Sequence, residues 1–362
     1  MMISETLLYV CFSVLVGGTL LSLVPENKKP LIVVPRTIMS SSLVGIVFLS
    51  LFPVINLVYY YVTNLNYEVG YVAYTVLTDY KVGTGWIYTV FIATVLFYLL
   101  EIKPPAPGNK LGSYAKFLLS IALVFTMGWS SHAATIYEWG GFLAHTIHFL
   151  AITLWMGVML VTAWFAQDKG NWIALLRWFT PLAILCMIAS ITAGIVLASY
   201  ISPDYYNSWM LSYGQALLIK HIAIIPLLWI AFINGFLIKA RLIKDEGFDP
   251  RPWLKIESMI VLFIFSVTAY LGQQSPPHNV IETLKEEKPA SLFLWLYQGK
   301  FHPEMKVSLF LNWGSILLAV MACLCLLVAL VVFRERKPLH WAFISCILFV
   351  VLCYVSVMLA IR

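Results

Sequence analysis

The chain has 362 residues and a formal net charge of +6; 61% of its residues are hydrophobic and only 11% are charged. With a mean hydropathy of +0.88 it is too apolar for an ordinary soluble domain, which predicts an integral membrane protein in contact with lipid. No basic patch interleaved with exposed aromatic residues indicates a nucleic-acid partner.

Long apolar segments follow one another along the chain, and a helix needs ~20 apolar residues to cross ~30 Å of hydrocarbon. About ten such spans are predicted, at residues 5–24, 36–62, 83–100, 113–131, 139–166, 178–199, 212–238, 254–272, 307–333 and 339–361. Strand alternation is absent, so the predicted fold class is all-α, a polytopic helical membrane bundle. Glu5, with no Lys or Arg ahead of it, favours an uncleaved first span over a signal peptide.

The basic residues fall mainly in alternate loops. Most of the 23 Lys and Arg lie in loops 25–36, 101–116, 167–177, 239–255 and 334–338, whereas loops 63–82, 132–138, 200–211 and 273–306 are poor in them. Cytoplasmic loops carry the excess of Lys and Arg, so the first set is predicted to be cytoplasmic. Both chain ends are then predicted to lie outside.

Histidines gather in the outer half of the predicted spans. His132 lies at the outer end of one span, and His145, His148 and His221 lie roughly 9 to 14 Å below the outer surface at 1.5 Å per residue. His145 and His148 are three residues apart and project from the same face of a helix. Imidazoles bind copper in either oxidation state and thioethers favour Cu(I). The prediction is an outer-leaflet copper site of His132, His145 and His148, with His221 as a fourth ligand and Met127 as a softer one.

Each of these residues also has a structural interpretation. A lone membrane histidine can hydrogen-bond a neighbouring backbone group, and a methionine can simply fill space. Lys220 either extends outward to the headgroups or faces the bundle interior. The cysteines favour packing, although Cys325 and Cys346 on adjacent antiparallel helices would offer an inner copper relay.

Helix contacts follow from small residues and from short loops. Gly140, Gly141, Gly157 and Gly194 are predicted at close contacts among the four spans from residue 113 to residue 238. Loop 132–138 is short, so the spans that flank it should be antiparallel neighbours. In the outer loop, ASLFLWLYQG (290–299) is too short to span and is predicted to lie at the interface as a lid or a structural cap. His278 and His302 in that loop are the next metal-ligand candidates.

Two longer patterns carry a family resemblance. The run GWSSHAATIYEWGGFLAHTIHFLAITLWMGVML (128–160), with Trp155 and Gly157 after His148, resembles the CopD-type copper resistance D family, as does SYGQALLIKH (212–221) followed by FINGFL (232–237). The resemblance covers about residues 112–275. It implies a multi-pass plasma-membrane (bacterial cytoplasmic membrane) protein of copper uptake or handling. It favours His132, His148 and Lys220 as family positions, and it implies a separate extracytoplasmic copper-donor protein as partner.

The resemblance also divides the chain into four predicted segments: three N-terminal membrane helices (1–111), a CopD-like core of five (112–275), an extracytoplasmic loop (276–306) and a C-terminal helix pair (307–362). ATP-binding and hydrolase motifs are absent from the sequence, so an enzyme is not predicted. The predicted function is copper transport across the membrane, with import from outside. The alternative is a b-type haem protein for electron transfer, with His148 and His221, or His132 and His145, as axial ligands. A copper sensor or assembly factor is a third interpretation.

Overall fold

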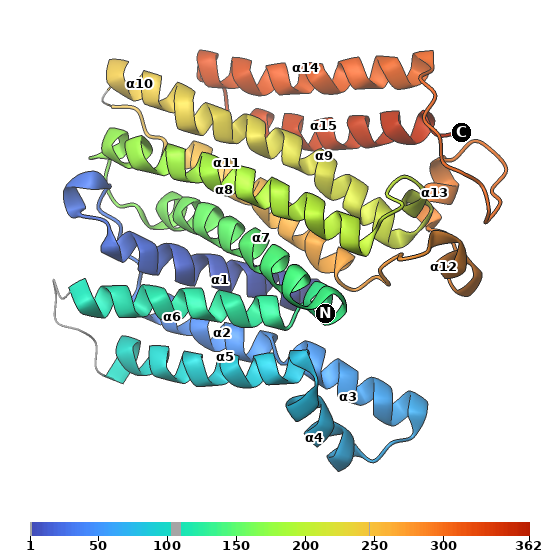
Figure 1. The fold of residues 1–362 in the computed structure, drawn as a ribbon. Helices are drawn as coiled ribbons and strands as arrows, with labels where there is room; N and C mark the ends of the chain where they lie inside the picture. Colours follow the sequence, from blue (N-terminus) through green and yellow to red (C-terminus); the bar gives the residue numbers. More distant parts are fainter. Residues whose placement is uncertain (1, 103–109, 246) are drawn as a thin grey trace. The chain divides into compact units, whose positions relative to one another are not determined.

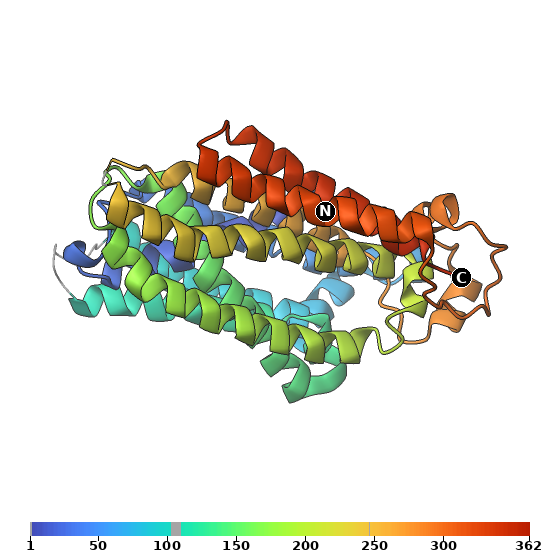
Figure 2. The same cartoon turned by 90° about the horizontal axis from the view of Figure 1, so that it is seen from above.

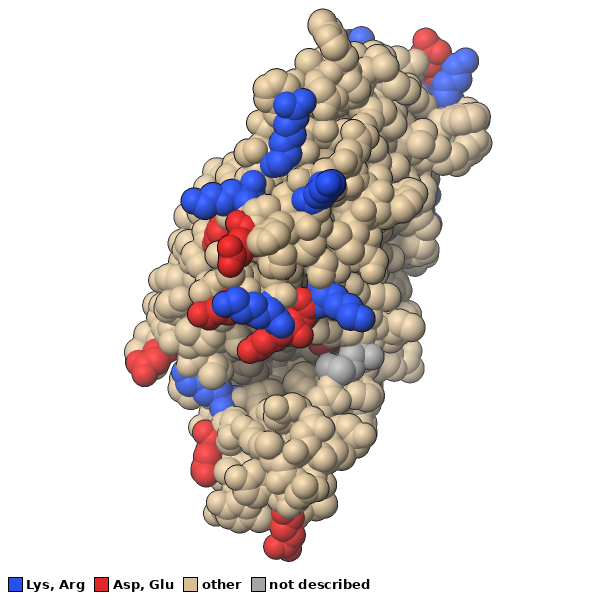
Figure 3. Space-filling model, turned by 90° about the vertical axis from the view of Figure 1, so that its right-hand side faces the viewer, with Lys and Arg blue, Asp and Glu red and all other residues tan. Residues whose placement is uncertain are grey.

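The computed structural model describes residues 2–102, 110–245 and 247–362. The described residues are helical apart from turns, loops and two isolated β-bridges, and ten of the helical segments are long and apolar enough to cross a membrane. This confirms the predicted all-α membrane fold. Figure 3 shows one face of the molecule, most of which is covered by residues other than Lys, Arg, Asp and Glu. Side chains such as Leu185 and Ile195, 64% and 66% exposed, project from the spans toward lipid.

The chain forms two compact units, one of residues Ile3–Tyr200 and one of residues Ile201–Arg362. The division into four segments that the resemblance implied is based on sequence similarity and not on packing, and it stays a prediction. The helices that build the first unit in Figure 1 are α1 (Met2–Leu23), α2 (Arg36–Leu49), α3 (Phe52–Leu65), α4 (Val69–Asp79), α5 (Lys81–Phe97), α6 (Lys110–Trp129), α7 (His132–Phe165) and α8 (Trp172–Ile201).

A buried apolar cluster joins α1, α2, α5, α6 and α7. It includes Phe12, Ile46, Leu96 and Leu123, and Phe149 of α7 closes it. The rings of Phe12 and Phe149 meet edge to face at 5.1 Å between centroids. The single histidine-bearing span of this unit is therefore packed into a core built largely by helices that precede it.

Glycines allow two of the closest helix approaches in this unit. A Cβ atom on Gly157 of α7 would collide with the carbonyl oxygen of Ser13 and the backbone of Gly17 in α1. The prediction placed Gly157 against one of the spans between residues 113 and 238, but its partner is α1, because Gly17 supplies the matching small residue. Gly194 of α8 faces the ring of His148, with 3.3 Å between its ideal Cβ position and Cε1.

Predicted loop 132–138 is wrong, because most of it is the start of α7. The side chain of Ser131 accepts a hydrogen bond from the backbone N–H of Ala134, which caps the helix at His132. The helix then breaks at Tyr137 and Glu138, where Glu138 adopts φ 42° and ψ −117°. Tyr137 stacks on Tyr200 with 4.2 Å between ring centroids, and its hydroxyl donates to the Tyr200 carbonyl at 3.1 Å. These contacts with α8 hold the break.

The predicted span 36–62 is also interrupted. It divides into α2 and α3 at Ser50 and Leu51, and Pro53 stands in the first turn of α3, where its missing N–H costs no helical hydrogen bond. Predicted loop 63–82 contains α4, which packs on α3 through Val54, Val72 and Val76. Ser50 is the single polar residue at the division of α2 and α3, and the polar residues Asn64, Asn66 and Glu68 before α4 indicated a loop.

The second unit contains α9 (Ser212–Phe232), a π-helical turn (Ile233–Leu237), α10 (Ile238–Lys244), α11 (Arg251–Leu271), α12 (Val280–Glu286), α13 (Ser291–Leu296), α14 (Trp313–Glu335) and α15 (His340–Leu359). Figure 2 shows α14 and α15 side by side. The predicted start of the ninth span at 307 is wrong: Asn312 caps α14, and Leu309 before it forms a β-bridge with Ile361. The segment 290–299 holds the short helix α13, and the backbone N–H of Ala290 donates to the Met210 carbonyl at 2.8 Å.

Loops that belong to the same predicted set contact one another. In the first unit, the Gln167 N–H donates to the Leu31 carbonyl at 2.8 Å and joins two of the basic loops. In the second unit, Arg336 and Asp245 of two other basic loops form an ion pair at 2.7 Å, and at the opposite helix ends the Val307 N–H donates to Asn207 Oδ1. The first two contacts join basic loops to basic loops, and which set of loops faces the cytoplasm stays a prediction.

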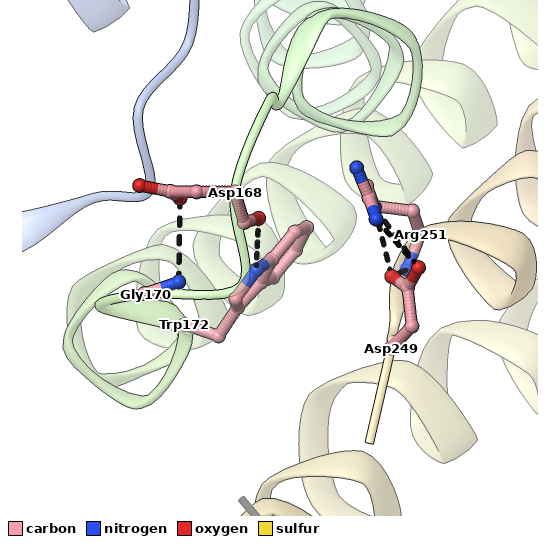
Figure 4. Close-up of polar contacts among 5 residues, drawn as sticks. All are labelled: Asp168, Gly170, Trp172, Asp249 and Arg251. Atoms are coloured by element: carbon pink, nitrogen blue, oxygen red, sulfur yellow. Dashed lines mark hydrogen bonds and ion pairs between the residues drawn. The ribbon is translucent and has the colours of Figure 1, made fainter. Parts of the chain in front are cut away.

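Local polar contacts set the starts of two spans (Figure 4). Before α8, Asp168 Oδ1 accepts from the Gly170 N–H at 3.3 Å, and the Asp168 carbonyl accepts from Trp172 Nε1 at 3.2 Å. Before α11, Asp249 pairs with Arg251 at 2.7 Å and accepts its backbone N–H. Asp249 thus satisfies a backbone donor that the start of α11 leaves open, and Asp168 orders the turn that leads into α8.

Candidate functional site

His148 links α7 to α8. Its Nδ1 lies 2.7 Å from the backbone carbonyl oxygen of Ser190, and the ring rests beside Gly194 one turn further along α8. The side chain is half-buried. The absence of a side chain on Gly194 leaves the room that the imidazole occupies.

This contact determines the tautomer of His148. A carbonyl oxygen only accepts, so Nδ1 carries the hydrogen and donates it. The lone pair of the neutral ring is then on Nε2, which is the atom that binds a metal when Nδ1 donates to a backbone carbonyl. The arrangement is the one that orients histidine ligands in metal proteins.

His145 lies one turn before His148 on α7 and is also half-buried. Its ring lies 6.2 Å from that of Phe149 between centroids, and Phe149 contacts Tyr9 and Phe12 of α1. The two histidines therefore share one side of α7, as their spacing predicts, but His148 is held by α8 whereas His145 lies next to a ring that packs on α1.

The other two candidates of the first unit lie apart from this pair in different ways. His132 is exposed and is the first residue of α7, on the outer side of the break at Tyr137 and Glu138. Met127 of α6 is half-buried and packs against the apolar cluster that contains Phe149. The surroundings of Met127 fit the packing interpretation, and a ligand role for His132 stays a prediction.

His221 belongs to the second unit. The Tyr205 hydroxyl and His221 Nδ1 are 2.7 Å apart, and the two rings lie 5.6 Å apart between centroids. His221 is exposed on α9, and the neighbouring Lys220 is half-buried. Burial raises the pKa of Tyr205 in the loop before α9, which keeps this phenol protonated and able to donate to His221.

Within the described ranges, no three His, Cys, Asp or Glu side chains come together as a group that could hold a metal ion. The predicted histidine ligands thus do not come together as such a group: His145 and His148 lie on α7, His132 at its start, and His221 beside Tyr205. The full predicted ligand set stays a prediction.

Sequence reasoning missed a polar pair in the second unit. Glu257 of α11 and Asn234 of the π-helical turn are buried, with 3% and 5% exposure, and Asn234 Nδ2 donates to Glu257 Oε2 at 2.6 Å. An acidic residue inside the predicted span 254–272 was the available signal, because ionisable groups in membrane helices are costly and usually functional.

Comparison with known proteins finds a family similarity over part of the chain. Residues 173–271 match the model of the family described as copper resistance protein D, CopD. This segment is therefore similar to the CopD family. The match begins later than the predicted 112–275, so it covers α8, α9 and α11 but not α7. Ser190, His221 and the Asn234 and Glu257 pair lie within the CopD segment; His132, His145 and His148 lie before it.

Two relatives extend the similarity beyond that segment. The chain is 26% identical over 211 residues to the inner membrane protein YebZ of Escherichia coli, which covers 52% of this chain and 68% of YebZ. It is 22% identical over 234 residues to the copper transport protein CutJ of Bacillus subtilis, which covers 61% of this chain and 42% of CutJ. The chain thus spans less than half the length of CutJ. No solved structure matches.

Proposed function

We propose that this multi-pass protein transports copper across the cytoplasmic membrane, with import from the extracytoplasmic side, and that His148 is the anchoring ligand. The observation that carries the proposal is the Nδ1–H of His148 donating to the Ser190 carbonyl at 2.7 Å, which leaves the lone pair on Nε2. A histidine inside a membrane span is costly, and a metal-ligand role accounts for its retention there.

His145 is the second ligand in this proposal. It lies on the same side of α7 one turn closer to the outer end, so an ion passing from His145 to His148 would move inward along one helix. His132 receives the ion at the exposed start of α7, and His221 and Met127 are accessory ligands. Imidazole ligands accept either Cu(I) or Cu(II), which suits a carrier that takes copper from an extracytoplasmic donor protein.

The comparisons support a copper role and not a particular direction. CopD is described as a copper resistance protein, and the printed name of CutJ is a copper transport protein. Import rests on the resemblance to a family of copper uptake or handling and on the predicted outer position of the histidines, and the outward-facing termini rest on the basic-loop pattern. A transporter of this kind needs ligand exchange and a route, not an enzymatic group, so the proposal includes no catalytic residue.

Copper binding tests the ligand assignment. Purified protein is titrated with Cu(I) against a competing chelator, for the native chain, His148→Ala, His145→Ala and the double variant. We expect the His148→Ala variant to bind at least about 10-fold more weakly and the double variant to lose the site. The matched control is His340→Ala, an exposed histidine at the start of α15, which should leave the affinity unchanged.

Copper movement tests the transport step. Cells with and without the gene are compared for accumulated copper, together with cells that carry the double variant. Import predicts more copper with the native gene than with the double variant or none, and the reverse order indicates export. The absorption spectrum of the same preparation separates the haem alternative, because a b-type haem protein is red with a Soret band.

A further inference from the structure

Asn234 and Glu257 form a polar pair inside the second unit. Asn234 Nδ2 donates to Glu257 Oε2 at 2.6 Å and also contacts the Trp253 carbonyl at 3.4 Å. Trp253 and Glu257 are four residues apart on α11, so one amide group spans one turn of that helix. The Trp253 carbonyl also settles the amide orientation, because only the NH₂ side of Asn234 can donate to it.

Among the described residues, no cation balances a negative charge on the Glu257 carboxyl: no Lys, Arg or His there forms an ion pair with it. Its hydrogen-bond donor is the Asn234 amide. Arg241 of α10 is engaged elsewhere: its guanidinium donates to the Phe333 carbonyl at 2.5 Å and lies over the rings of Phe248 and Phe333. A carboxylate buried in this way would cost several kcal/mol.

The other atom of the amide is also unsatisfied. Asn234 Oδ1 is buried and has no hydrogen-bond partner among the residues that the structure describes, and a buried acceptor without a donor is destabilising. It belongs to the same side chain whose Nδ2 is bonded to Glu257. A hydrogen on Glu257 supplies the missing donor.

We propose that Glu257 and Asn234 form a proton-binding site within the membrane, in which the protonated Glu257 carboxyl donates to Asn234 Oδ1 while Asn234 Nδ2 donates to the other carboxyl oxygen. One proton removes the buried charge and satisfies the orphan acceptor. Its release leaves a carboxylate held by Asn234 Nδ2 alone. The ligand of the site is a proton, taken up and released during the working cycle.

The backbone at this pair has the form found at other functional positions in helices. Asn234 is the second residue of the π-helical turn Ile233–Leu237, between α9 and α10, and such turns are rare and occur often at functional sites. The turn interrupts the regular α-helical hydrogen bonding next to Glu257. The site stands on these contacts and does not depend on the histidines of α7.

Infrared spectroscopy of the purified, full-length protein in lipid tests the site. At neutral pH, where an exposed glutamate is ionised, we expect the carbonyl band of a protonated carboxylic acid. The band should be absent from Glu257→Gln and retained in Glu335→Gln, a control for a 58% exposed side chain at the end of α14. It should move to higher frequency in Asn234→Leu, because the carbonyl loses the Nδ2 hydrogen bond.

The band must also titrate. We expect it to disappear reversibly at alkaline pH while the helical circular dichroism signal persists. A native protein without the band at neutral pH, a band that survives in Glu257→Gln, or a band that never titrates in folded protein overturns the proposal. Glu257→Gln should fold, because its amide replaces the donating proton, and its unchanged Cu(I) affinity would separate this site from the histidine site.

Discussion

His148 and Ser190 lie 2.7 Å apart across the interface of α7 and α8, with a ring nitrogen donating to a backbone carbonyl. A helix carbonyl normally accepts from the N–H four residues later, so this oxygen serves two donors. The contact is insensitive to the identity of residue 190, because it uses the backbone. The contact depends instead on Gly194, because the absence of a side chain there leaves room for the imidazole.

Gly194→Leu should therefore disturb His148. A Cβ atom at Gly194 already lies 3.3 Å from Cε1 and 3.4 Å from Nδ1 of the ring, so a larger side chain must displace the imidazole. We expect Cu(I) affinity to fall by about 10- to 100-fold, measured by chelator competition. Gly170→Ala, whose nearest contact is the Asp168 side chain at 3.6 Å, is the control. Unchanged affinity in Gly194→Leu would contradict the anchoring role of His148.

Gly157→Leu tests the contact between α1 and α7. The added side chain would collide with the backbone of Ser13 and Gly17, and neither can move without separating the helices. Overpacking of this kind costs about 1–3 kcal/mol or more, so the thermal unfolding midpoint in detergent should fall. Gly70→Ala, in α4 with its nearest contact at 3.8 Å, should leave the midpoint unchanged. Equal midpoints for both variants would show that the close approach is absent.

Copper binding should depend on pH through its histidine ligands. A ring nitrogen binds metal only when it is unprotonated, so affinity should fall as pH drops through the unperturbed histidine value of ~6.5. Chelator competition between pH 8 and pH 5 measures this loss. In His145→Ala, which keeps one of the paired ligands, the slope of affinity against pH should be shallower. A pH-independent affinity would exclude histidine ligands.

Tyr205 should make the second unit sensitive to alkaline pH. Burial raises its pKa in the folded protein, so the neutral phenol is favoured by folding. Its contribution to stability is complete below the unfolded-state value of ~10 and is lost as pH rises through the higher folded value. In Tyr205→Phe the unfolding midpoint should fall less above pH 10 than in the native protein, because no phenol is left at this position to ionise. The substitution also deletes the hydroxyl bonded to His221. A native-like alkaline loss in Tyr205→Phe would place the cause elsewhere.

Cysteine labelling tests the topology. A cysteine introduced at Gly247, in the basic loop before α11, should react with an impermeant thiol reagent only after cells are opened. A cysteine at Lys300, in the outer loop, should react in intact cells. The native chain measures background from its own cysteines, which lie in helices. Labelling in the reverse pattern would show that each set of loops faces the side of the membrane opposite to the predicted one.

The sequence was sufficient for the spans because bilayer thickness fixes their length, and apolar runs of that length are unmistakable. It was insufficient where polar patterning does not mark a boundary. The division at Ser50, helix α4 in a presumed loop and the helical start at His132 all depend on local contacts, such as the Ser131 cap, that hydropathy does not register.

The site was predictable in part for the same reason. Spacing alone placed His145 and His148 on one side of a helix. The neighbours of each ring depend on tertiary packing: the His148 ring packs beside Gly194 of α8, and the His145 ring lies next to Phe149. Glu257 was within reach of sequence reasoning, whereas its partner Asn234, 23 positions earlier, follows only from the packing of α9 on α11.

The break at Tyr137 and Glu138 divides α7 into two pieces. Glu138 holds a backbone conformation that side-chain-bearing residues rarely adopt, and the turn that carries His132 lies close against the rest of α7: a Cβ atom on Gly141 would collide with the Ala133 carbonyl oxygen. Lys81 Nζ donates to the Ala134 carbonyl of the same turn at 2.5 Å. Gly141 is therefore the residue that lets the chain turn at this break, and any larger side chain there would displace the turn that carries His132.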